Sequence, residues 1–302
     1  GIAVILHIFD AKLSLEAIER HRVTVIGQIP ALFNMEWRLP EYGNYDLSSL
    51  RFAIYGGQAV SREFLVKMKT MAPRIGTGLG LTETAGFCTY THVDADVDEL
   101  ARGIGYDSPL CPISIRNFMQ TDGTAGAEKR PGEVGEICFS GPQIFLGYLG
   151  DPGNTAKTIS REGFCYTGDI GFYDQQGLHF SGRAKLVIKP KGYQVFPEDV
   201  ENHIHSKLRD RAGMVAIVGV EHEVFGEGIV AFVECREGKT ITPDEVLAAC
   251  SDISAYSRPS HVVILEAGEI PLNRVAKTDY LNLRERAKDI VRQLRAEGHW
   301  DR

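Results

Sequence analysis

A glycine-rich stretch, TGLGLTETAG at residues 77–86, contains the first side chains with evident chemistry. Its glycines let the backbone approach a ligand closely, and Thr82 and Glu83 follow with a hydroxyl and a carboxylate. This pair suits a nucleotide phosphate with its magnesium ion, because Mg²⁺ usually takes one or two carboxylates together with phosphate oxygens. A glycine-rich turn with a capping threonine explains the same string equally well, so both interpretations stay open.

Two other stretches place polar groups where strands are expected to end. Residues 56–59, GGQA, close a strand just before a helix, and ligands bind at such strand ends in open α/β sheets. Asp169 ends the run FCYTGD, where its carboxylate could accept hydrogen bonds from a ribose diol. The structural alternatives are a plain tight turn for the glycines and an ordinary strand-ending turn for the aspartate.

The segment at residues 182–201, GRAKLVIKPKGYQVFPEDVE, carries a basic run into a predicted helix. Arg183 offers a planar fork for phosphate or ribose oxygens, and Lys185, Lys189 and Lys191 form a basic stripe. A solvated strand face explains such a stripe as well, and for Lys191 it is the better explanation. Pro197 at the first helical position, with acidic residues behind it, predicts that a helix starts there.

Lys277 lies in IPLNRVAKTDY, after a proline turn and before the last predicted helix. A loop that presents one lysine can deliver a point charge to a transition state, although an isolated lysine is usually only a surface charge. His203 and His205 are two residues apart on a predicted helix and do not share a face, so we expect both to be structural.

Composition limits the class of protein. The chain has 302 residues, 43% of them hydrophobic, which is enough for two domains. Its formal net charge of -7 argues against a general nucleic-acid or membrane-surface binder. Six scattered cysteines indicate reduced thiols in a cytoplasmic protein, with neither a disulfide framework nor a zinc site.

The apolar opening GIAVILHIF is too short to span a bilayer and has no basic leader, so it predicts a buried strand. Because it starts at Gly1 without an initiator methionine, we expect the chain to be part of a longer protein.

The order of predicted elements indicates an α/β protein. Helices are expected at residues 14–22, with Ser14 as the N-cap, and at residues 61–71. Strands are expected at residues 23–26 and 50–55. Strands that alternate with helices in this way predict a parallel sheet. From about Gly103, short apolar runs separated by Gly, Pro and Asp predict a small antiparallel β unit. After Lys185 the pattern is mixed again, with strands expected at 215–220 and 229–234, a capping box at Thr242 and a charged helix at 281–297.

The order and spacing of these motifs carry more information than any one of them. TGLGLTETAG, GFCYTGD, GRAKLVIKPKGYQVFPEDVE and IPLNRVAKTDY, in that order, resemble the adenylate-forming superfamily of acyl-CoA synthetases, peptide-synthetase adenylation domains and luciferases. RFAIYGGQAV at residues 51–60 is similar to that family's adenine-binding strand end. The resemblance runs from Gly1 to about Leu283.

The resemblance implies a domain plan. Residues 1–184 would be the C-terminal part of a large α/β AMP-binding domain, with 1–102 in its sheet and 103–184 in the small β unit. Residues 185–302 would form a small, mobile α+β C-terminal domain that turns about a hinge at Lys185.

The resemblance also implies roles for single residues. In the nucleotide site, Thr82 would contact phosphate and Glu83 would hold Mg²⁺. Asp169 would bind the ribose hydroxyls, with Arg183 as a second contact. The residues along the adenine would be Gly56, Gly57 and Gln58, and Gly80 would also belong to the cofactor site. Lys277 would bridge the carboxylate and the phosphate during adenylation. Lys189 and Gly192 would face the thiol after rotation. Residues 30–33, with Gly80 and Ala85, would line the acyl pocket.

The implied function is ATP-dependent adenylation of a fatty or aromatic carboxylic acid, followed by thioester formation with coenzyme A. Two alternatives stay open: an adenylation module that loads a carrier protein's phosphopantetheine thiol, and a catalytically silent nucleotide-binding fragment. The sequence departs from the family at Leu79, which is usually aromatic, and at Ala276, which is often glycine. The family's phosphate loop is expected upstream of these residues and is not among them.

Overall fold

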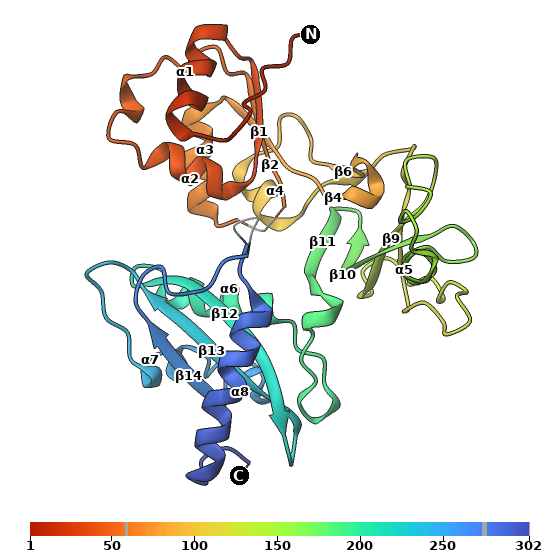
Figure 1. The fold of residues 1–302 in the computed structure, drawn as a ribbon, viewed down its shortest axis with the longest axis vertical. Coiled ribbons are helices and arrows are strands. Elements are labelled where there is room, and N and C mark those ends of the chain that lie inside the picture. The colour runs from red at the N-terminus through yellow and green to blue at the C-terminus, as the bar shows by residue number, and fades with distance from the viewer. Residues whose placement is uncertain (58–59, 274–276, 302) are drawn as a thin grey trace. The chain divides into compact units, whose positions relative to one another are not determined.

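The structure, a computed structural model, describes residues 1–57, 60–273 and 277–301. The chain divides into unit 1, Gly1–Phe180, and unit 2, Ser181–Arg302 (Figure 1). The division falls inside strand β11 (Gly177–Arg183), a few residues before Lys185. Both units combine helices and sheets, so the prediction of an α/β protein is confirmed.

Unit 1 begins with a three-stranded parallel sheet in the order β1-β2-β3. Its strands are β1 (Val25–Gln28), β2 (Phe52–Tyr55) and β3 (Arg74–Gly76). The helices of this part are α1 (Ala11–His21), α2 (Pro30–Trp37), α3 (Arg62–Met71) and α4 (Val97–Arg102). Parallel strands joined through helices are what the alternating sequence pattern predicts.

Local capping decides where two of these helices start. Ser61 caps α3, because its hydroxyl accepts from the Phe64 amide at 3.2 Å, and the helix matches the one expected at residues 61–71. Helix α1 starts three residues earlier than predicted. Its cap is Asp10, whose carboxylate accepts from the Leu13 amide at 2.8 Å, and Ser14 is buried inside the helix.

The prediction of a buried strand at the opening apolar run is wrong. Residues 1–10 contain no strand, and Ile2 and Ile5 are 97% and 85% exposed. A strand needs a neighbour to satisfy its backbone, and among the described strands β1 pairs with β2 alone.

A second sheet in unit 1 has the order β11-β10-β9-β8. It consists of β8 (Ile113–Arg116), β9 (Gly135–Phe139), β10 (Cys165–Asp174) and β11, and β8–β9 and β9–β10 pair antiparallel, as predicted. The short helix α5 (Pro152–Thr158) lies between β9 and β10 in sequence. Two-stranded pairs connect the two sheets along the chain: β4 (Gly80–Leu81) with β5 (Gly86–Phe87), and β6 (Thr89–Tyr90) with β7 (Tyr106–Asp107).

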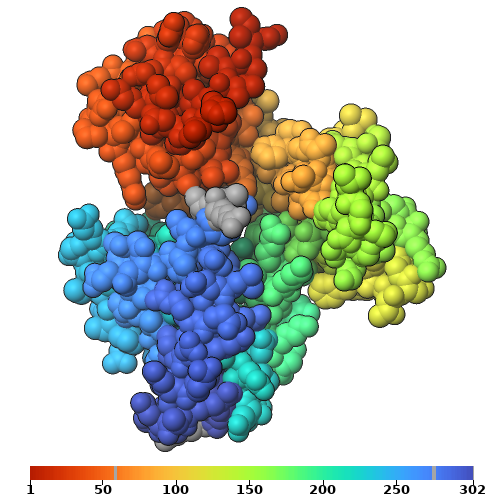
Figure 2. Space-filling model, in the orientation of Figure 1, coloured from red at the N-terminus to blue at the C-terminus, as the bar shows by residue number. Residues whose placement is uncertain are grey.

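Unit 2 is a three-stranded sheet with helices on both faces. β12 (Ala212–His222) pairs antiparallel with β13 (Gly226–Cys235), which pairs parallel with β14 (His261–Leu265). Helices α6 (Pro197–Leu208) and α7 (Pro243–Ala249) cover one face, and α8 (Tyr280–Ala296) covers the other (Figure 1). The outer face of α8, dark blue in Figure 2, is at the surface.

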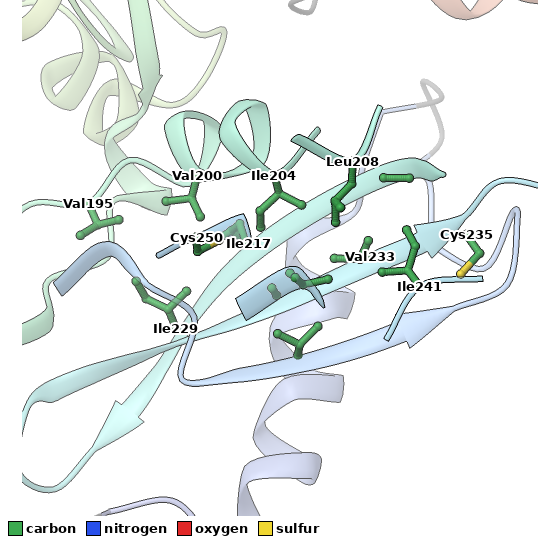
Figure 3. Packing of buried hydrophobic residues seen from close by; sticks show 14 of the residues in the cluster. Val195, Val200, Ile204, Leu208, Ile217, Ile229, Val233, Cys235, Ile241 and Cys250 are labelled. Carbon is green, nitrogen blue, oxygen red and sulfur yellow. The ribbon is translucent and has the colours of Figure 1, made fainter. Parts of the chain in front are cut away.

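Alternation along the strands produces the two cores of unit 2. Ile217 and Val233 point toward α6 (Figure 3). Val218 and Phe232 are buried on the other face, with the apolar residues of α8. In α6, Val200 and Ile204 are buried at the predicted four-residue spacing, and burying each such side chain stabilises the fold by roughly 1.5–3 kcal/mol. The capping box that starts α7 at Thr242 is confirmed.

Candidate functional site

The end of β2 meets the glycine-rich stretch directly. A Cβ atom on Gly56 would lie 2.8 Å from Cζ of Phe87, so a side chain at this position would displace the ring from this strand end. The hydroxyl of Thr77 donates to the carbonyl of Tyr55 at 2.9 Å, which ties the first residue of the stretch to the same strand. Gly56 and Gly57 therefore lie beside the TGLGLTETAG stretch. Gln58 lies outside the described residues.

A tight hairpin holds the turn that contains Thr82 and Glu83. β4 and β5 pair so closely that a Cβ on Gly80 would lie 2.3 Å from the carbonyl oxygen of Gly86. The buried Thr84 hydroxyl accepts from the Leu81 amide at 2.9 Å and donates to the Gly86 carbonyl at 2.8 Å. Ala85 closes the turn in the left-handed conformation, with φ 52°. The 3₁₀ turn Thr82–Thr84 is thereby held in place, with Thr82 exposed and Glu83 half-buried.

Tyr148 holds the Glu83 carboxylate. Its hydroxyl donates to Oε1 of Glu83 at 2.6 Å, and the amide of Phe145 donates to the Glu83 carbonyl at 2.8 Å. The hydrogen bond to the charged carboxylate raises the pKa of Tyr148. Sequence reasoning missed Tyr148, because nothing in FLGYLGDP predicts that it reaches a residue 65 positions away.

The donor set around Glu83 fits a magnesium ion that also binds phosphate. Within the described ranges, His, Cys, Asp and Glu nowhere gather in the groups of three or more that an all-protein metal cage requires. One hard carboxylate beside an exposed hydroxyl is the usual protein share of a Mg²⁺–phosphate site, in which phosphate and water supply the other ligands.

Asp169 lies in a bulge within β10, not in the strand-ending turn that its sequence context suggested. The β9–β10 register shifts between Tyr166 and Ile170, and Gly168 at the shift has φ 73°. Such bulges re-aim a side chain without ending the strand. The hydroxyl of Thr167 accepts from the Asp169 amide at 3.0 Å, and the carboxylate of Glu136 accepts from the Gly168 amide at 3.0 Å. Asp169 is 2% exposed, so its orientation is built into the sheet.

The start of β10 lies near the Glu83 turn. Burial, followed by the charge of Glu83, raises the pKa of the Cys165 thiol to about 12. Leu79 and Leu81 pack against the apolar core of the second sheet, with Ile137 and Phe139. Unit 1 therefore joins the β2 end, the glycine-rich hairpin and the β10 segment through continuous packing.

The basic segment of unit 2 is anchored by its backbone. The amide of Lys189 donates to Oε2 of Glu227 at 2.6 Å, and the amide of Lys191 donates to the carbonyl of Phe225 at 2.7 Å. Lys191 and Gly192 both have positive φ, 54° and 82°, and the Lys191 ammonium lies 4.0 Å from the Phe225 ring centroid. Arg183, Lys185 and Lys189 are exposed, with Lys185 in the 3₁₀ turn Ala184–Leu186.

Lys277 lies in a loop closed on itself. Its amide donates to Oδ1 of Asn273 at 3.1 Å, and its carbonyl accepts from the Asn273 amide at 2.7 Å. The Asp279 amide donates to the Pro271 carbonyl at 2.8 Å and closes the base of the loop. Ala276, the departure noted before this lysine, lies outside the described residues.

The remaining candidates are structural or lie in the core. His203 contacts the carbonyl of Ala249 and the carboxylate of Asp252 at 3.0 and 2.8 Å, which supports its structural interpretation. Phe33, at the end of the predicted acyl-lining residues 30–33, is fully buried and stacks on Trp37. The six cysteines are free, buried thiols.

Two family models match the chain: "AMP-binding enzyme" over residues 1–149 and "AMP-binding enzyme C-terminal domain" over residues 210–277. Among curated proteins, the chain is 33% identical to 4-coumarate--CoA ligase 2 of Nicotiana tabacum over 290 residues, covering 92% of this chain and 52% of that protein. It is 34% identical to 4-coumarate--CoA ligase 1 of Solanum tuberosum over 289 residues, with 92% and 51% covered. The chain therefore spans about half the length of the curated relatives it matches.

Solved structures agree with the sequence comparison. The amide bond synthetase McbA from Marinactinospora thermotolerans matches with a TM-score of 0.81 and 27% identity, over 94% of this chain and 56% of that one. ATP-bound MatB from Rhodopseudomonas palustris matches with a TM-score of 0.79 and 26% identity, over 95% and 55%. The chain belongs to the adenylate-forming superfamily of AMP-binding enzymes.

Proposed function

We propose that this protein is an AMP-forming carboxylate–CoA ligase, which activates a carboxylic acid with ATP and passes the acyl group to coenzyme A. The observation that carries the proposal is that three features of unit 1 lie next to one another. They are the end of β2, the hairpin that holds Thr82, and the Glu83 carboxylate that Tyr148 binds. Family membership supports the same reaction class. The names of the 4-coumarate--CoA ligases support coenzyme A as the thiol.

In the first half-reaction, the residues of unit 1 would bind and orient the nucleotide. Gly56, Gly57 and Gln58 would lie along the adenine, with Gly80 in the hairpin below. Asp169 would accept from the ribose hydroxyls, and Arg183 would add a second contact. Thr82 would donate to phosphate. Positioning of this kind can supply roughly 7–11 kcal/mol of the barrier reduction.

Glu83 would hold the magnesium ion, with Tyr148 fixing the orientation of the carboxylate. A bound Mg²⁺ would neutralise the phosphate charge that develops as pyrophosphate leaves.

Unit 2 would act in both half-reactions. Lys277 would bridge the substrate carboxylate and the α-phosphate while acyl-AMP forms, which places a positive charge where negative charge develops. Rotation about Lys185 would then remove Lys277 and bring Lys189 and Gly192 to the thiol. Coenzyme A would attack the acyl carbonyl, and AMP would leave.

We infer a fatty or aromatic acid as the substrate. The expected pocket residues are small and apolar (Pro30, Ala31, Leu32, Gly80 and Ala85), and no aspartate among them would hold an α-amino group. The relatives named for 4-coumarate favour the aromatic choice. We also propose a cytoplasmic location, on the evidence of the six free thiols. None of the helices in the described part of the chain has the length and apolar character needed to cross a membrane.

The test is ATP–pyrophosphate exchange by the full-length protein with a panel of aromatic, fatty and amino acids. We expect exchange with an aromatic or fatty acid, followed by acyl-CoA on addition of coenzyme A. If acyl-AMP is discharged only by a phosphopantetheinylated carrier protein, the enzyme is a carrier-loading module. If no acid supports exchange, the chain is a nucleotide-binding protein only.

Lys277→Ala separates the two half-reactions. Because Lys277 would act only while acyl-AMP forms, we expect the variant to lose adenylation by at least about 100-fold. Thioester formation from supplied acyl-AMP should stay within about threefold of the parent. Lys239→Ala, which removes an exposed lysine in the turn after β13, is the control. Unchanged exchange in Lys277→Ala would remove this lysine from the mechanism.

A further inference from the structure

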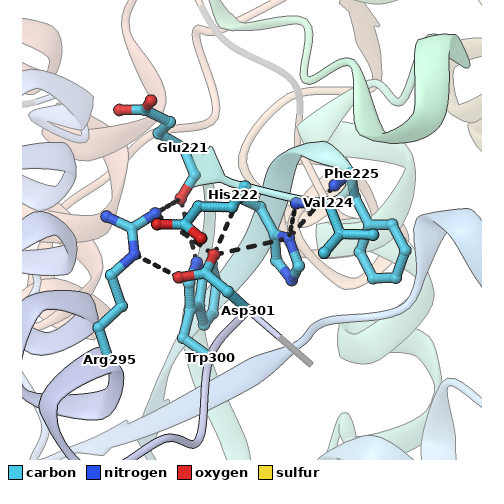
Figure 4. Close-up of polar contacts among 8 residues, drawn as sticks. Glu221, His222, Val224, Phe225, Arg295, Trp300 and Asp301 are labelled. Atoms are coloured by element: carbon cyan, nitrogen blue, oxygen red, sulfur yellow. Dashed lines mark hydrogen bonds and ion pairs between the residues drawn. The ribbon is translucent and has the colours of Figure 1, made fainter.

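A group of side chains in the last turn of α8 and just beyond it contacts the end of β12. Arg295 pairs with the Asp301 carboxylate at 2.5 Å and donates to the carbonyl of Glu221 at 2.8 Å (Figure 4). The indole N–H of Trp300 donates to the same carbonyl at 3.0 Å, and Oδ1 of Asp301 accepts from the Glu223 amide at 2.9 Å. We call Arg295, Trp300 and Asp301 the clasp.

The clasp is packed as well as hydrogen-bonded. Trp300 is 4% exposed, and its ring lies against the backbone of Gly228, where a Cβ would come within 2.5 Å of it. The Trp300 ring also lies beside the buried His222 ring, at 5.5 Å between centroids. The clasp therefore fixes both strands that flank the β12–β13 turn.

His222 connects the clasp to the β12–β13 turn. Its Nδ1 accepts from the amides of Val224 and Phe225 at 3.2 and 3.3 Å, and its ring stacks on Phe225 at 4.4 Å between centroids (Figure 4). The conformation of Phe225 is thus set on one side by His222 and, through it, by the clasp.

The other side of the turn holds the basic segment. The carbonyl of Phe225 accepts a hydrogen bond from the Lys191 amide, and the Phe225 ring contacts the Lys191 ammonium. The carboxylate of Glu227 accepts a hydrogen bond from the Lys189 amide. Contacts therefore run without a break from Asp301 to residues 189–192, all within unit 2.

We propose that the clasp is a positioning element for residues 189–192, and so for the thiol half-reaction. The proposal rests on the proposed function for its catalytic consequence, although the physical link stands on the contacts alone. The clasp residues touch neither Lys277 nor its loop in any contact described above. Loosening the clasp should therefore disturb the thiol step and spare adenylation.

The experiment compares Asp301→Ala with Asp289→Ala in the full-length protein. Asp289 is the matched control, because it is an exposed carboxylate on α8. Its ion-pair partner is Arg292, one turn along the same helix, at 3.1 Å. We expect Asp301→Ala to raise the KM for coenzyme A about 10-fold, the loss expected for a charge-assisted hydrogen bond, with adenylation changed less than about twofold. Asp289→Ala should change neither.

Hydrogen exchange of the Lys189 and Lys191 amides gives a readout that does not depend on catalysis. We expect faster exchange at both amides in Asp301→Ala and parent-like exchange in Asp289→Ala. Trp300→Phe, which keeps a ring on Gly228, should restore most of the protection that Trp300→Leu loses. If Asp301→Ala fails to fold, Asp301→Asn takes its place, because it keeps the shape and one acceptor oxygen.

Two results would overturn the proposal: unchanged exchange at residues 189–192 in a folded clasp variant, or equal losses in adenylation and thiol transfer. Absence of any thiol transfer in the parent protein would instead count against the proposed function, while the exchange measurement would still decide the physical link.

Discussion

At the scale of single residues, the structure adds partners to the side chains that the motifs select. Glu83 illustrates this, since its carboxylate is oriented by a tyrosine hydroxyl from a distant loop. Residues that hold a metal-binding carboxylate in place usually contribute strongly to metal affinity.

Tyr148→Phe tests that contribution. Removing the hydroxyl frees the Glu83 carboxylate to turn, so we expect the Mg²⁺ concentration for half-maximal adenylation to rise about 10-fold. The measurement is exchange activity titrated with Mg²⁺. Tyr173→Phe is the control, because it removes a similar bond, to Asp107 at 2.7 Å, elsewhere in unit 1. Equal Mg²⁺ requirements in both variants would argue against a metal at Glu83.

Glu201 predicts a pH dependence of stability. It accepts from the Ile217 amide at 2.8 Å and from the Tyr280 hydroxyl at 2.9 Å, and burial raises its pKa to about 7. Because the folded pKa lies above the unfolded value, the neutral form is favoured in the fold. The stability from this group is complete below about pH 4.5 and is lost as pH rises through 7.

We therefore expect unit 2 to lose on the order of 2 kcal/mol of unfolding free energy between pH 5 and pH 8 through Glu201. Thermal melts across that range should show the loss in the parent and a flatter profile in Glu201→Gln. The exposed Glu285→Gln should keep the parent profile. A parent-like slope in Glu201→Gln would assign the dependence to another group.

At the scale of elements, the β4–β5 hairpin is the feature most sensitive to one added atom. In Gly80→Ala, the new methyl group meets a backbone oxygen that cannot move without opening the hairpin. We expect a loss of about 2 kcal/mol in the unfolding free energy of unit 1 and much weaker ATP binding. Gly27→Ala in β1, which meets nothing within 4 Å, is the control for denaturant melts and nucleotide titration. Normal ATP binding by Gly80→Ala would remove the hairpin from the site.

The elements also show what the sequence could and could not predict. Local signals predicted helix starts correctly: Pro197 starts α6, the capping box at Thr242 precedes α7, and α3 lies within the helix expected at residues 61–71. Features that depend on pairing between distant residues were not predicted. The opening apolar run forms no strand, and the bulge at Gly168 that re-aims Asp169 depends on pairing with β9. Tyr148 was not predicted either, because its role depends on a contact with a residue 65 positions away in the sequence. The motif residues themselves were identified by their order along the chain.

At the scale of the whole molecule, each unit has its own apolar cores and its own tryptophan, Trp37 in unit 1 and Trp300 in unit 2. Among the residues that the structure describes, the cores of the two units have no buried residue in common. Domains with separate cores are expected to respond separately to core substitutions.

Val233→Ala tests this independence. Val233 is fully buried in unit 2, and its truncation should cost about 2–3 kcal/mol. In the Trp37→Phe background, fluorescence reports unit 2, and we expect its unfolding midpoint to fall. In the Trp300→Phe background, the unit 1 midpoint should not change. Met68→Ala, in the core of unit 1, should give the opposite pattern, and a joint shift of both midpoints would show one cooperative molecule.

The place where the chain passes from one unit to the other has a final consequence. The division between the units falls within β11, so this strand contributes residues to both units. A backbone that is already hydrogen-bonded in a strand has few torsions left to fix. Fixing one residue costs about 1–2 kcal/mol of conformational entropy, and the ordered residues of β11 have met this cost when the strand forms.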